Sequence, residues 1–239
     1  MKILIEIIIY DKILIQITRR DYMISKYSAV LFDFDGTVAD TGKGIFMSIQ
    51  YAIGCLGFEP LDGETLRRFI GPPIYDSFKR ELGLDNEKSD FAVKKYREKY
   101  AETGIFEFDL YDGILPLMKT LHENGIKVGI ASSKPQNFLM KIVDYLKISD
   151  IIDFISAPSA DDTPQSKASL INNSAEALNV SKDKILMVGD RYFDIDGANG
   201  AGVESVGVTF GYGSEEELKK SGATYIAGCA DEISKIIFG

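Results

Sequence analysis

Two aspartates two residues apart, Asp33 and Asp35, follow a short apolar segment and precede Gly36. Residues i and i+2 of an extended chain point the same way, so both carboxylates can reach one ligand. One carboxylate can attack phosphorus, while the other donates a proton to the leaving oxygen and later takes one from water. Asp and Gly also favour ordinary turns, so a solvated turn is the alternative for this motif alone.

Three later segments place polar side chains after apolar runs or at the start of an expected helix. Ser132 follows an apolar run, and its hydroxyl can either bond a phosphate oxygen without adding charge or cap a helix. Lys167 begins an expected helix, where a lone lysine is ordinarily solvated surface. Asp190 and Asp194 follow another apolar run, and this placement favours a functional site over a turn.

The elements that must position these residues follow an alternating pattern. From Ser28 onward short apolar runs alternate with helical patterns, which predicts an α/β fold whose parallel sheet is covered by helices. Ligands of such sheets bind beyond the carboxyl ends of the strands, where the polar residues fall. The expected strands cover residues 29–32, 127–131, 152–156, 185–188 and 205–208.

One long stretch breaks this alternation because it holds only helical patterns. We expect residues 42–110 to form a small helical cap inserted into a Rossmann-like core made of residues 28–41 and 111–239. Asp112 is expected to cap the helix that returns the chain to this core. The expected cap helices cover residues 44–56, 63–69, 74–82 and 88–102.

Residues 1–27 precede this pattern and are rich in isoleucine. Charged residues interrupt the apolar runs, which stay shorter than the roughly 20 residues of a membrane helix, and no small-residue cleavage site follows them. Residues 2–7 and 12–17 are similar β-branched runs about a polar break, which suggests a hairpin. We expect an appended segment outside the catalytic design, with Met23 as an alternative start; an extra pair of edge strands is the other interpretation.

The composition and net charge restrict the kinds of molecule that this chain can be expected to bind. The chain has 239 residues and a formal net charge of −9, which argues against a nucleic-acid polymer as the ligand. We expect a small phosphate ester as substrate, no membrane partner, a cytoplasmic location and a monomer or small homo-oligomer. Cys55 and Cys229 fit free thiols in a reducing compartment. His122 is the only histidine, which argues against a histidine-dependent triad or a histidine-rich zinc site.

The segment AVLFDFDGTVADT at residues 29–41 strongly resembles the first motif of the haloacid dehalogenase superfamily, in its phosphatase branch. Segments 129–132, 166–168 and 187–194 resemble the three further motifs in the family's order. The family more often has proline after the motif lysine, where this chain has Ala168. Dehalogenases of the superfamily lack the second aspartate, so the presence of Asp35 favours phosphoryl transfer over dehalogenation.

This resemblance implies a Mg²⁺-dependent phosphomonoester hydrolase that passes through an aspartyl-phosphate. Asp33 would be the nucleophile, Asp35 the general acid and base, and Lys167 the cation that offsets charge on the phosphate and the nucleophile. The residues implied for the phosphate are Gly36, Thr37, Ser132 and Lys167. Those implied for Mg²⁺ are Asp33, Asp35 through its backbone carbonyl, Asp190 and Asp194.

The motifs constrain the identity of the substrate less than they constrain the reaction. The cap resembles that of the subgroup containing phosphoglycolate phosphatases and β-phosphoglucomutases, whereas segment 161–163 with the later GDRYFDIDGA resembles bacterial 5′-nucleotidase-type relatives. A phosphosugar mutase on the same core and a non-catalytic phosphoacceptor or binding module are the alternatives. Within the cap, Arg67, Arg68 and Lys79 are candidates for contacting the part of the substrate away from the phosphate.

Overall fold

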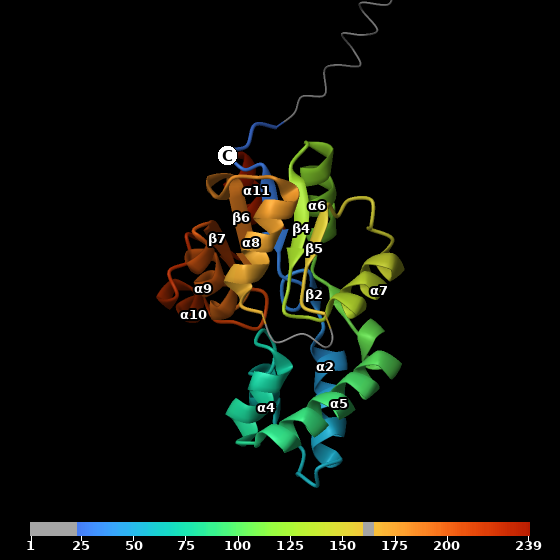
Figure 1. The fold of residues 1–239 in the computed structure, drawn as a ribbon. Coiled ribbons are helices and arrows are strands. Elements are labelled where there is room, and N and C mark those ends of the chain that lie inside the picture. Colours follow the sequence, from blue (N-terminus) through green and yellow to red (C-terminus); the bar gives the residue numbers. More distant parts are fainter. Residues whose placement is uncertain (1–22, 160–164) are drawn as a thin grey trace, which may run out of the picture.

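Six parallel strands form the central sheet in the computed structural model, which describes residues 23–159 and 165–239 (Figure 1). The expected hairpin and segment 161–163 lie outside the described residues. The strands lie in the order β5-β4-β1-β6-β7-β8, and every neighbouring pair is parallel. Their bounds are β1 Ala29–Phe32, β4 Lys127–Ala131, β5 Phe154–Ser156, β6 Ile185–Gly189, β7 Glu204–Val208 and β8 Tyr225–Ala227.

Strand β1 lies in the middle of the sheet and is buried on both faces. Val30 and Phe32 belong to one apolar core, together with residues of helices α6 and α11. Ala29 and Leu31 belong to a second core on the other face, with residues of α8 and α9. Side chains of a strand alternate between faces, so Asp33 continues the row of Ala29 and Leu31 on the α8 side.

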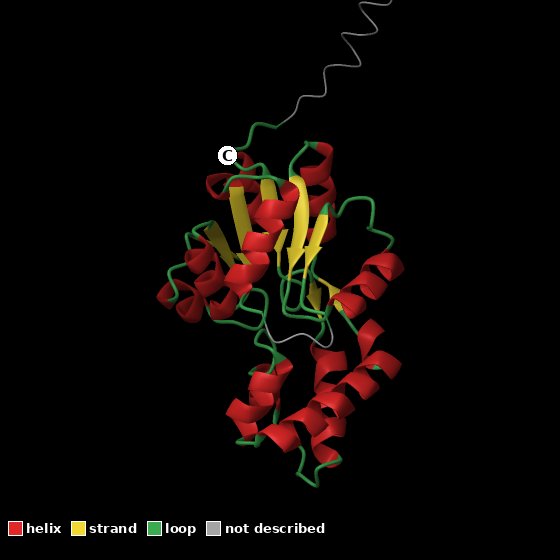
Figure 2. Cartoon of the chain, in the orientation of Figure 1, coloured by secondary structure: helices red, strands yellow, loops and turns green. Residues whose placement is uncertain are grey.

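Helices cover both faces of the sheet, which makes an α/β sandwich of three layers (Figure 2). The fold class expected from the alternating pattern is therefore confirmed. The helices of the sheet-bearing part are α6 Ile114–Glu123, α7 Gln136–Leu146, α8 Lys167–Leu178, α9 Tyr192–Ala201, α10 Glu215–Lys220 and α11 Ala230–Phe238, with a 3₁₀ turn η2 at Lys182–Lys184.

A separate group of helices lies beyond the carboxyl ends of the strands (Figures 1 and 2). We call the segment that contains them the helical insert; its helices are α2 Gly42–Gly54, α3 Gly63–Arg67, α4 Ile74–Leu82 and α5 Asn86–Glu102, followed by the 3₁₀ turn η1 Gly104–Phe106. Two short antiparallel strands, β2 Ala39–Asp40 and β3 Asp109–Leu110, pair where the chain leaves and re-enters the sheet-bearing part. This pairing brings the two ends of the insert together.

The structure differs from the sequence-based expectations at several element ends. The strand expected at 152–156 begins only at Phe154, and β8 was not expected. The short strand β3 lies inside the stretch expected to hold only helices. The prediction that Asp112 caps the returning helix is wrong, because Gly113 occupies the N-cap position with φ 77° and no side chain caps α6. A left-handed conformation at this position suits glycine, which has no Cβ.

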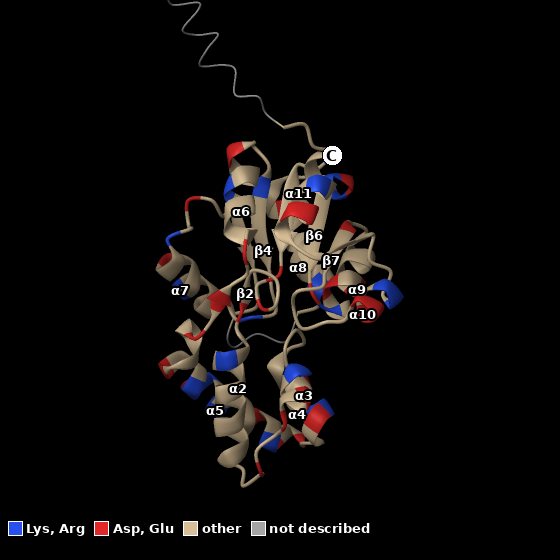
Figure 3. Ribbon diagram, turned by 180° about the vertical axis from the view of Figure 1, so that it is seen from behind, with Lys and Arg blue, Asp and Glu red and all other residues tan. Residues whose placement is uncertain are grey.

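Charged residues of both signs are interspersed over the sheet-bearing part and the helical insert (Figure 3). Within residues 23–159 and 165–239, no helix has the length and apolar character that crossing a bilayer requires. Cys55 and Cys229 are both exposed and unpaired.

Candidate active site

The site lies where the three neighbouring strands β4, β1 and β6 end. Ser132, Asp33 and Asp190 directly follow these strands. Because the strands are parallel neighbours, their carboxyl ends meet at one edge of the sheet. All three side chains are buried. The sheet therefore brings together residues that are more than 50 positions apart in the sequence.

Three carboxylates form an acidic cluster, which we define as Asp33, Asp190 and Asp194. Each offers one oxygen such that all three oxygens lie within 4.8 Å of one another. Gly36 allows this close approach: its φ is +86°, and a Cβ at this position would lie 2.2 Å from Asp190 Oδ2. Any larger residue would clash with the cluster and also strain the backbone. The glycine of the first motif thus makes room for the carboxylate of the fourth.

Lys167 is the cation that faces this cluster. Its Nζ lies 3.0 Å from Asp33 Oδ1 and 2.7 Å from Asp194 Oδ1, and it donates a hydrogen bond to the Ala131 carbonyl. Burial lowers the pKa of Lys167, but Asp194 and Asp33 outweigh this effect and raise it above the ordinary value. A lysine in the first turn of a helix is disfavoured by the helix dipole. Its position at the start of α8 is therefore explained by the two carboxylates.

The charges of this cluster do not balance without a further cation. Three buried carboxylates face one lysine, and burial is the main cause that raises the pKa of Asp33 to about 6 and that of Asp190 well above its usual range. Asp33 Oδ1 and Asp194 Oδ1 lie at ion-pair distance from Lys167, but neither is in hydrogen-bonding geometry with a described group. Carboxylates of this kind are the ligands that Mg²⁺ prefers. The donor set fits a divalent cation.

Two backbone amides and one hydroxyl contact Asp190 and Asp194. The amide of Tyr212 donates to Asp190 Oδ2 at 2.7 Å, and Thr37 Oγ1 lies 3.4 Å from Asp190 Oδ1. The amide of Arg191 donates to Asp194 Oδ2 at 3.1 Å, which also caps helix α9. The other oxygen of Asp194, Oδ1, faces Lys167 and the acidic cluster.

The side chain of Asp35 contacts a second lysine, Lys134. Lys134 Nζ lies 2.7 Å from Asp35 Oδ1, and Thr41 Oγ1 donates to the same oxygen at 2.6 Å. Lys134 is buried, and its Nζ lies 4.7 Å from the centre of the Tyr100 ring. The carboxylate of Asp35 is thus positioned by a cation and a hydroxyl rather than by the acidic cluster.

A cavity of about 60 Å³ lies between the sheet edge and the helical insert. Asp33, Asp35, Ser132 and Lys134 line it from the sheet side. Helix α5 and the loop before α4 close it from the insert side, with contributions that include Phe69, Ile74, Tyr96, Arg97 and Tyr100. The nucleophile expected from the sequence and its neighbouring aspartate therefore line the same cavity.

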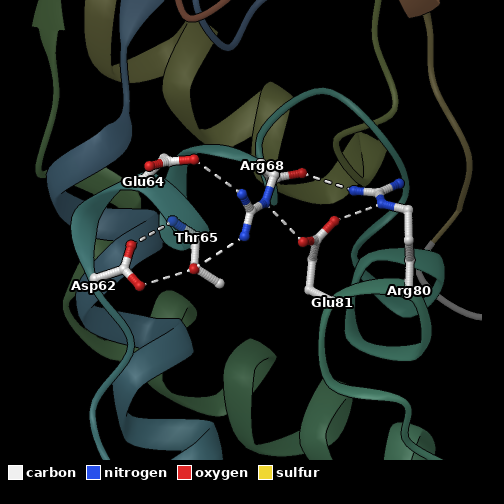
Figure 4. Close-up of polar contacts among 6 residues, drawn as sticks. All are labelled: Asp62, Glu64, Thr65, Arg68, Arg80 and Glu81. Atoms are coloured by element: carbon white, nitrogen blue, oxygen red, sulfur yellow. Dashed lines mark hydrogen bonds and ion pairs between the residues drawn. The ribbon is translucent and has the colours of Figure 1, made fainter.

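The cations expected to contact the substrate from the cap lie elsewhere. Arg67 is exposed and Arg68 binds within the insert, to Glu81 at 2.8 Å and to Glu64 at 3.2 Å (Figure 4). Its carbonyl accepts a hydrogen bond from Arg80, so Arg68 joins α3 to α4. The guanidinium of Arg68 is therefore engaged by partners inside the insert.

Lys79 is also exposed and donates to Asn86 at 2.9 Å. None of Arg67, Arg68 and Lys79 is among the residues that line the cavity. Sequence reasoning instead missed Lys134 and Arg97, which do line it. Lys134 lies two residues after Ser132, in the loop that follows the expected strand at 127–131. This position beyond a strand end could have marked Lys134 as a candidate site residue. Arg97 lies on a helix with several other cations, and the pattern offers no way to single it out.

Comparison with known proteins places this geometry in a family. Residues 30–208 match the family model described as haloacid dehalogenase-like hydrolase. A 5′-nucleotidase of Pseudomonas aeruginosa is 35% identical over 206 residues, which cover 86% of this chain and 92% of that protein. The tyrosine-protein kinase PtkA of Mycobacterium tuberculosis is 30% identical, with 87% of this chain and 72% of that protein covered.

Two further similarities concern proteins described as phosphatases. A phosphoglycolate phosphatase of Vibrio parahaemolyticus is 26% identical over 87% of this chain and 95% of its own. The crystal structure of a predicted phosphatase from Clostridium acetobutylicum superimposes with a TM-score of 0.84 at 37% identity, covering 87% of this chain and 97% of that one. The match extends over both the sheet and the helical insert.

Proposed function

This chain belongs to the haloacid dehalogenase-like hydrolase family and is a phosphatase, and we propose that it hydrolyses small phosphomonoesters with Mg²⁺ through a phosphorylated Asp33. The observation that carries this proposal is the position of Asp33. It is buried beside Lys167 and belongs both to the acidic cluster and to the wall of the cavity. A carboxylate in this position can attack a phosphorus atom that a cation and a lysine hold in place.

In the first step, a carboxylate oxygen of Asp33 forms a bond to phosphorus while the bond from phosphorus to the ester oxygen breaks. Asp35, protonated for this step, donates its proton to the leaving oxygen. Lys167 offsets the negative charge that gathers between Asp33 and the phosphoryl group. Ser132 and the backbone around Gly36 and Thr37 contribute donors for the phosphoryl oxygens.

In the second step, water attacks the phosphorus of phosphorylated Asp33. Asp35, now ionised, takes a proton from this water, and the bond between Asp33 and phosphorus breaks. Inorganic phosphate leaves and both aspartates return to their starting states. The cavity supports this sequence, because the sheet edge and the helical insert both line it and so limit the access of bulk water to the reacting groups.

The residues that would hold Mg²⁺ are Asp33, Asp190 and Asp194, with the backbone carbonyl of Asp35 as the further ligand expected from the motif. When bound, the ion neutralises charge on the phosphoryl oxygens and on the surrounding carboxylates. The unbalanced charge of the acidic cluster supports this assignment.

The relatives named 5′-nucleotidase and phosphoglycolate phosphatase give two candidate substrate types. The first experiment is a measurement of phosphate release from a panel of esters with Mg²⁺: phosphoglycolate, nucleoside 5′-monophosphates and an aryl phosphate. EDTA and Asp33→Asn are the controls. We expect turnover that both controls abolish. Undiminished turnover in Asp33→Asn would show that the assignment of the nucleophile is wrong, and activity in EDTA would contradict the metal.

A further inference from the structure

Three buried polar atoms without a partner meet at the cavity. Arg97 Nε, Tyr100 Oη and Ser133 Oγ make no hydrogen bond with any described residue, although each is shielded from solvent. All three residues line the cavity that also contains Asp33 and Asp35. An unsatisfied buried donor is costly, on the order of 1–3 kcal/mol, and native structures retain few of them. Their gathering at one cavity points to a ligand that supplies the missing partners.

The charge of Arg97 distinguishes it from the other cations near the site. Lys134 pairs with Asp35, and Lys167 pairs with Asp33 and Asp194. Arg97, by contrast, has no carboxylate within ion-pair distance in residues 23–159 and 165–239. Its guanidinium is a fork of donors without an acceptor, and it matches the geometry of a carboxylate or phosphate.

The remaining walls limit the size of what can bind. Apolar and aromatic groups such as Phe69, Ile74 and Tyr96 surround the polar atoms. The cavity measures about 60 Å³, whereas sites for drug-sized ligands occupy about 300–1,000 Å³. A phosphoryl group at Asp33 would fill much of a cavity of this size, which favours a compact leaving group beside Arg97.

We propose that Arg97, assisted by Ser133, binds a second anionic group on the leaving side of the substrate, so that this enzyme prefers small phosphomonoesters that carry a carboxylate or a similar compact anion. This inference rests on the proposed phosphatase function and deepens it. Arg97 lies on the insert and the nucleophile lies on the sheet side, so a substrate with two anionic ends joins the two parts. The anion on the leaving group supplies the partner that Arg97 lacks.

Matched esters test this preference. Phosphoglycolate and 2-hydroxyethyl phosphate are similar in size and differ in the charge of the leaving group. We expect the native enzyme to show a kcat/KM about 10-fold to 100-fold higher for phosphoglycolate, because only its carboxylate can accept a charge-assisted bidentate contact from Arg97. Arg97→Met should remove most of this ratio by lowering the value for phosphoglycolate alone, and Arg97→Lys should retain part of it. Lys94→Met changes an exposed cation on the same helix and is the matched control.

These measurements distinguish a failure of the Arg97 proposal from a failure of the proposed phosphatase function. If both esters are hydrolysed in an Asp33-dependent manner but at equal kcat/KM, or if Arg97→Met slows both alike, the role of Arg97 is overturned while the phosphatase function stands. If no ester is hydrolysed, the phosphatase function fails, and binding decides the role of Arg97. Calorimetric titration would then compare 3-phosphonopropionate with propylphosphonate. If 3-phosphonopropionate, which carries the carboxylate, binds about tenfold more tightly or better, and Arg97→Met removes this difference, the anion site is supported. Equal affinities overturn it.

Discussion

Lys134 Nζ lies 2.7 Å from Asp35 Oδ1 and 3.0 Å from Asp35 Oδ2, although 99 positions separate the two residues in the chain. Both oxygens of the carboxylate thus face one ammonium group, whose side chain is almost fully buried. The pair connects the loop after β1 to the loop after β4. Since Asp35 is the proposed proton carrier, Lys134 is placed to act through Asp35 as a positioning residue.

Replacing Lys134 by methionine should therefore lower kcat more than it raises KM. The apolar chain keeps the contact with Tyr100 but leaves the Asp35 carboxylate without its cation, so only Thr41 still holds its orientation. We expect a loss in kcat of roughly 10-fold to 100-fold, a fraction of what general acid–base catalysis contributes. Steady-state kinetics with an alkyl phosphate measures this loss.

A double-mutant cycle separates action through Asp35 from direct contact with substrate. In an Asp35→Asn background, Lys134→Met should cost little more, because the group on which it acts has already been removed. Losses that simply add would indicate that Lys134 binds the substrate itself.

Asp35→Asn should separate the two proposed steps. The amide cannot take a proton from water, so hydrolysis of phosphorylated Asp33 slows by roughly 10²-fold to 10⁴-fold. An aryl phosphate has a leaving group that needs little protonation, so its first turnover should remain fast. Rapid mixing should then show a burst of phenolate approaching one equivalent per site, followed by slow release. Linear release from the start would argue against a covalent intermediate.

The acidic cluster should make stability depend on both pH and Mg²⁺. The folded-state pKa of Asp33 is about 6, above its ordinary value of 3.8, so between these values the folded state binds more protons than the unfolded state. Without metal, the contribution of Asp33 to stability therefore falls as pH rises toward and through about 6, by on the order of 1–3 kcal/mol. Divalent cation should offset this loss.

Thermal unfolding in EDTA and in Mg²⁺ measures both effects. The gain in Tm from Mg²⁺ should be larger at pH 7.5 than at pH 5, because protons compete with the ion for the carboxylates. Asp33→Asn should gain stability relative to the native protein in EDTA as pH rises, since it removes one buried charge. A pH-independent difference between these two proteins would contradict the raised pKa.

The sheet and the acidic residues were predictable because each rests on a local pattern. The strands at Ala29–Phe32 and Lys127–Ala131 are short apolar runs ending in polar residues, and the structure has the same bounds. Parallel neighbours must end at one edge, so Asp33, Ser132 and Asp190 had to approach one another. The N-cap of helix α6 was predicted wrongly. The sequence pattern favoured Asp112 as a side-chain cap, but the chain adopts a left-handed conformation at this position, and Gly113 occupies it.

The contacts made by individual long side chains were not predictable in the same way. Arg68 and Arg97 both lie on expected helices of the insert, and nothing in the helical pattern says that the first binds Glu81 while the second faces the cavity. Their environments depend on how the insert packs against the sheet edge. Lys134 reaches Asp35 for a different reason: β1 and β4 are parallel neighbours, so the loops that follow them meet at one edge of the sheet, although no local pattern pairs these two side chains.

Arg191 joins the acidic cluster to the helical insert and supports a last prediction. It directly follows Asp190, its Nη1 donates to the carbonyl of Ile70 before α4, and its Nε binds Glu217 at 2.9 Å. Arg191→Met keeps the length of the chain but removes both contacts, each a hydrogen bond from a charged donor worth roughly 1.5–3 kcal/mol. We expect faster amide hydrogen exchange in residues 69–73 and a kcat/KM lower by about tenfold or more, chiefly through KM, because the insert closes the cavity less firmly. Lys94→Met, which changes an exposed cation of α5, is the control and should leave exchange in residues 69–73 unchanged. If Arg191→Met exchanges like the native protein in residues 69–73 yet loses activity, the residue acts on the acidic cluster instead of holding the insert.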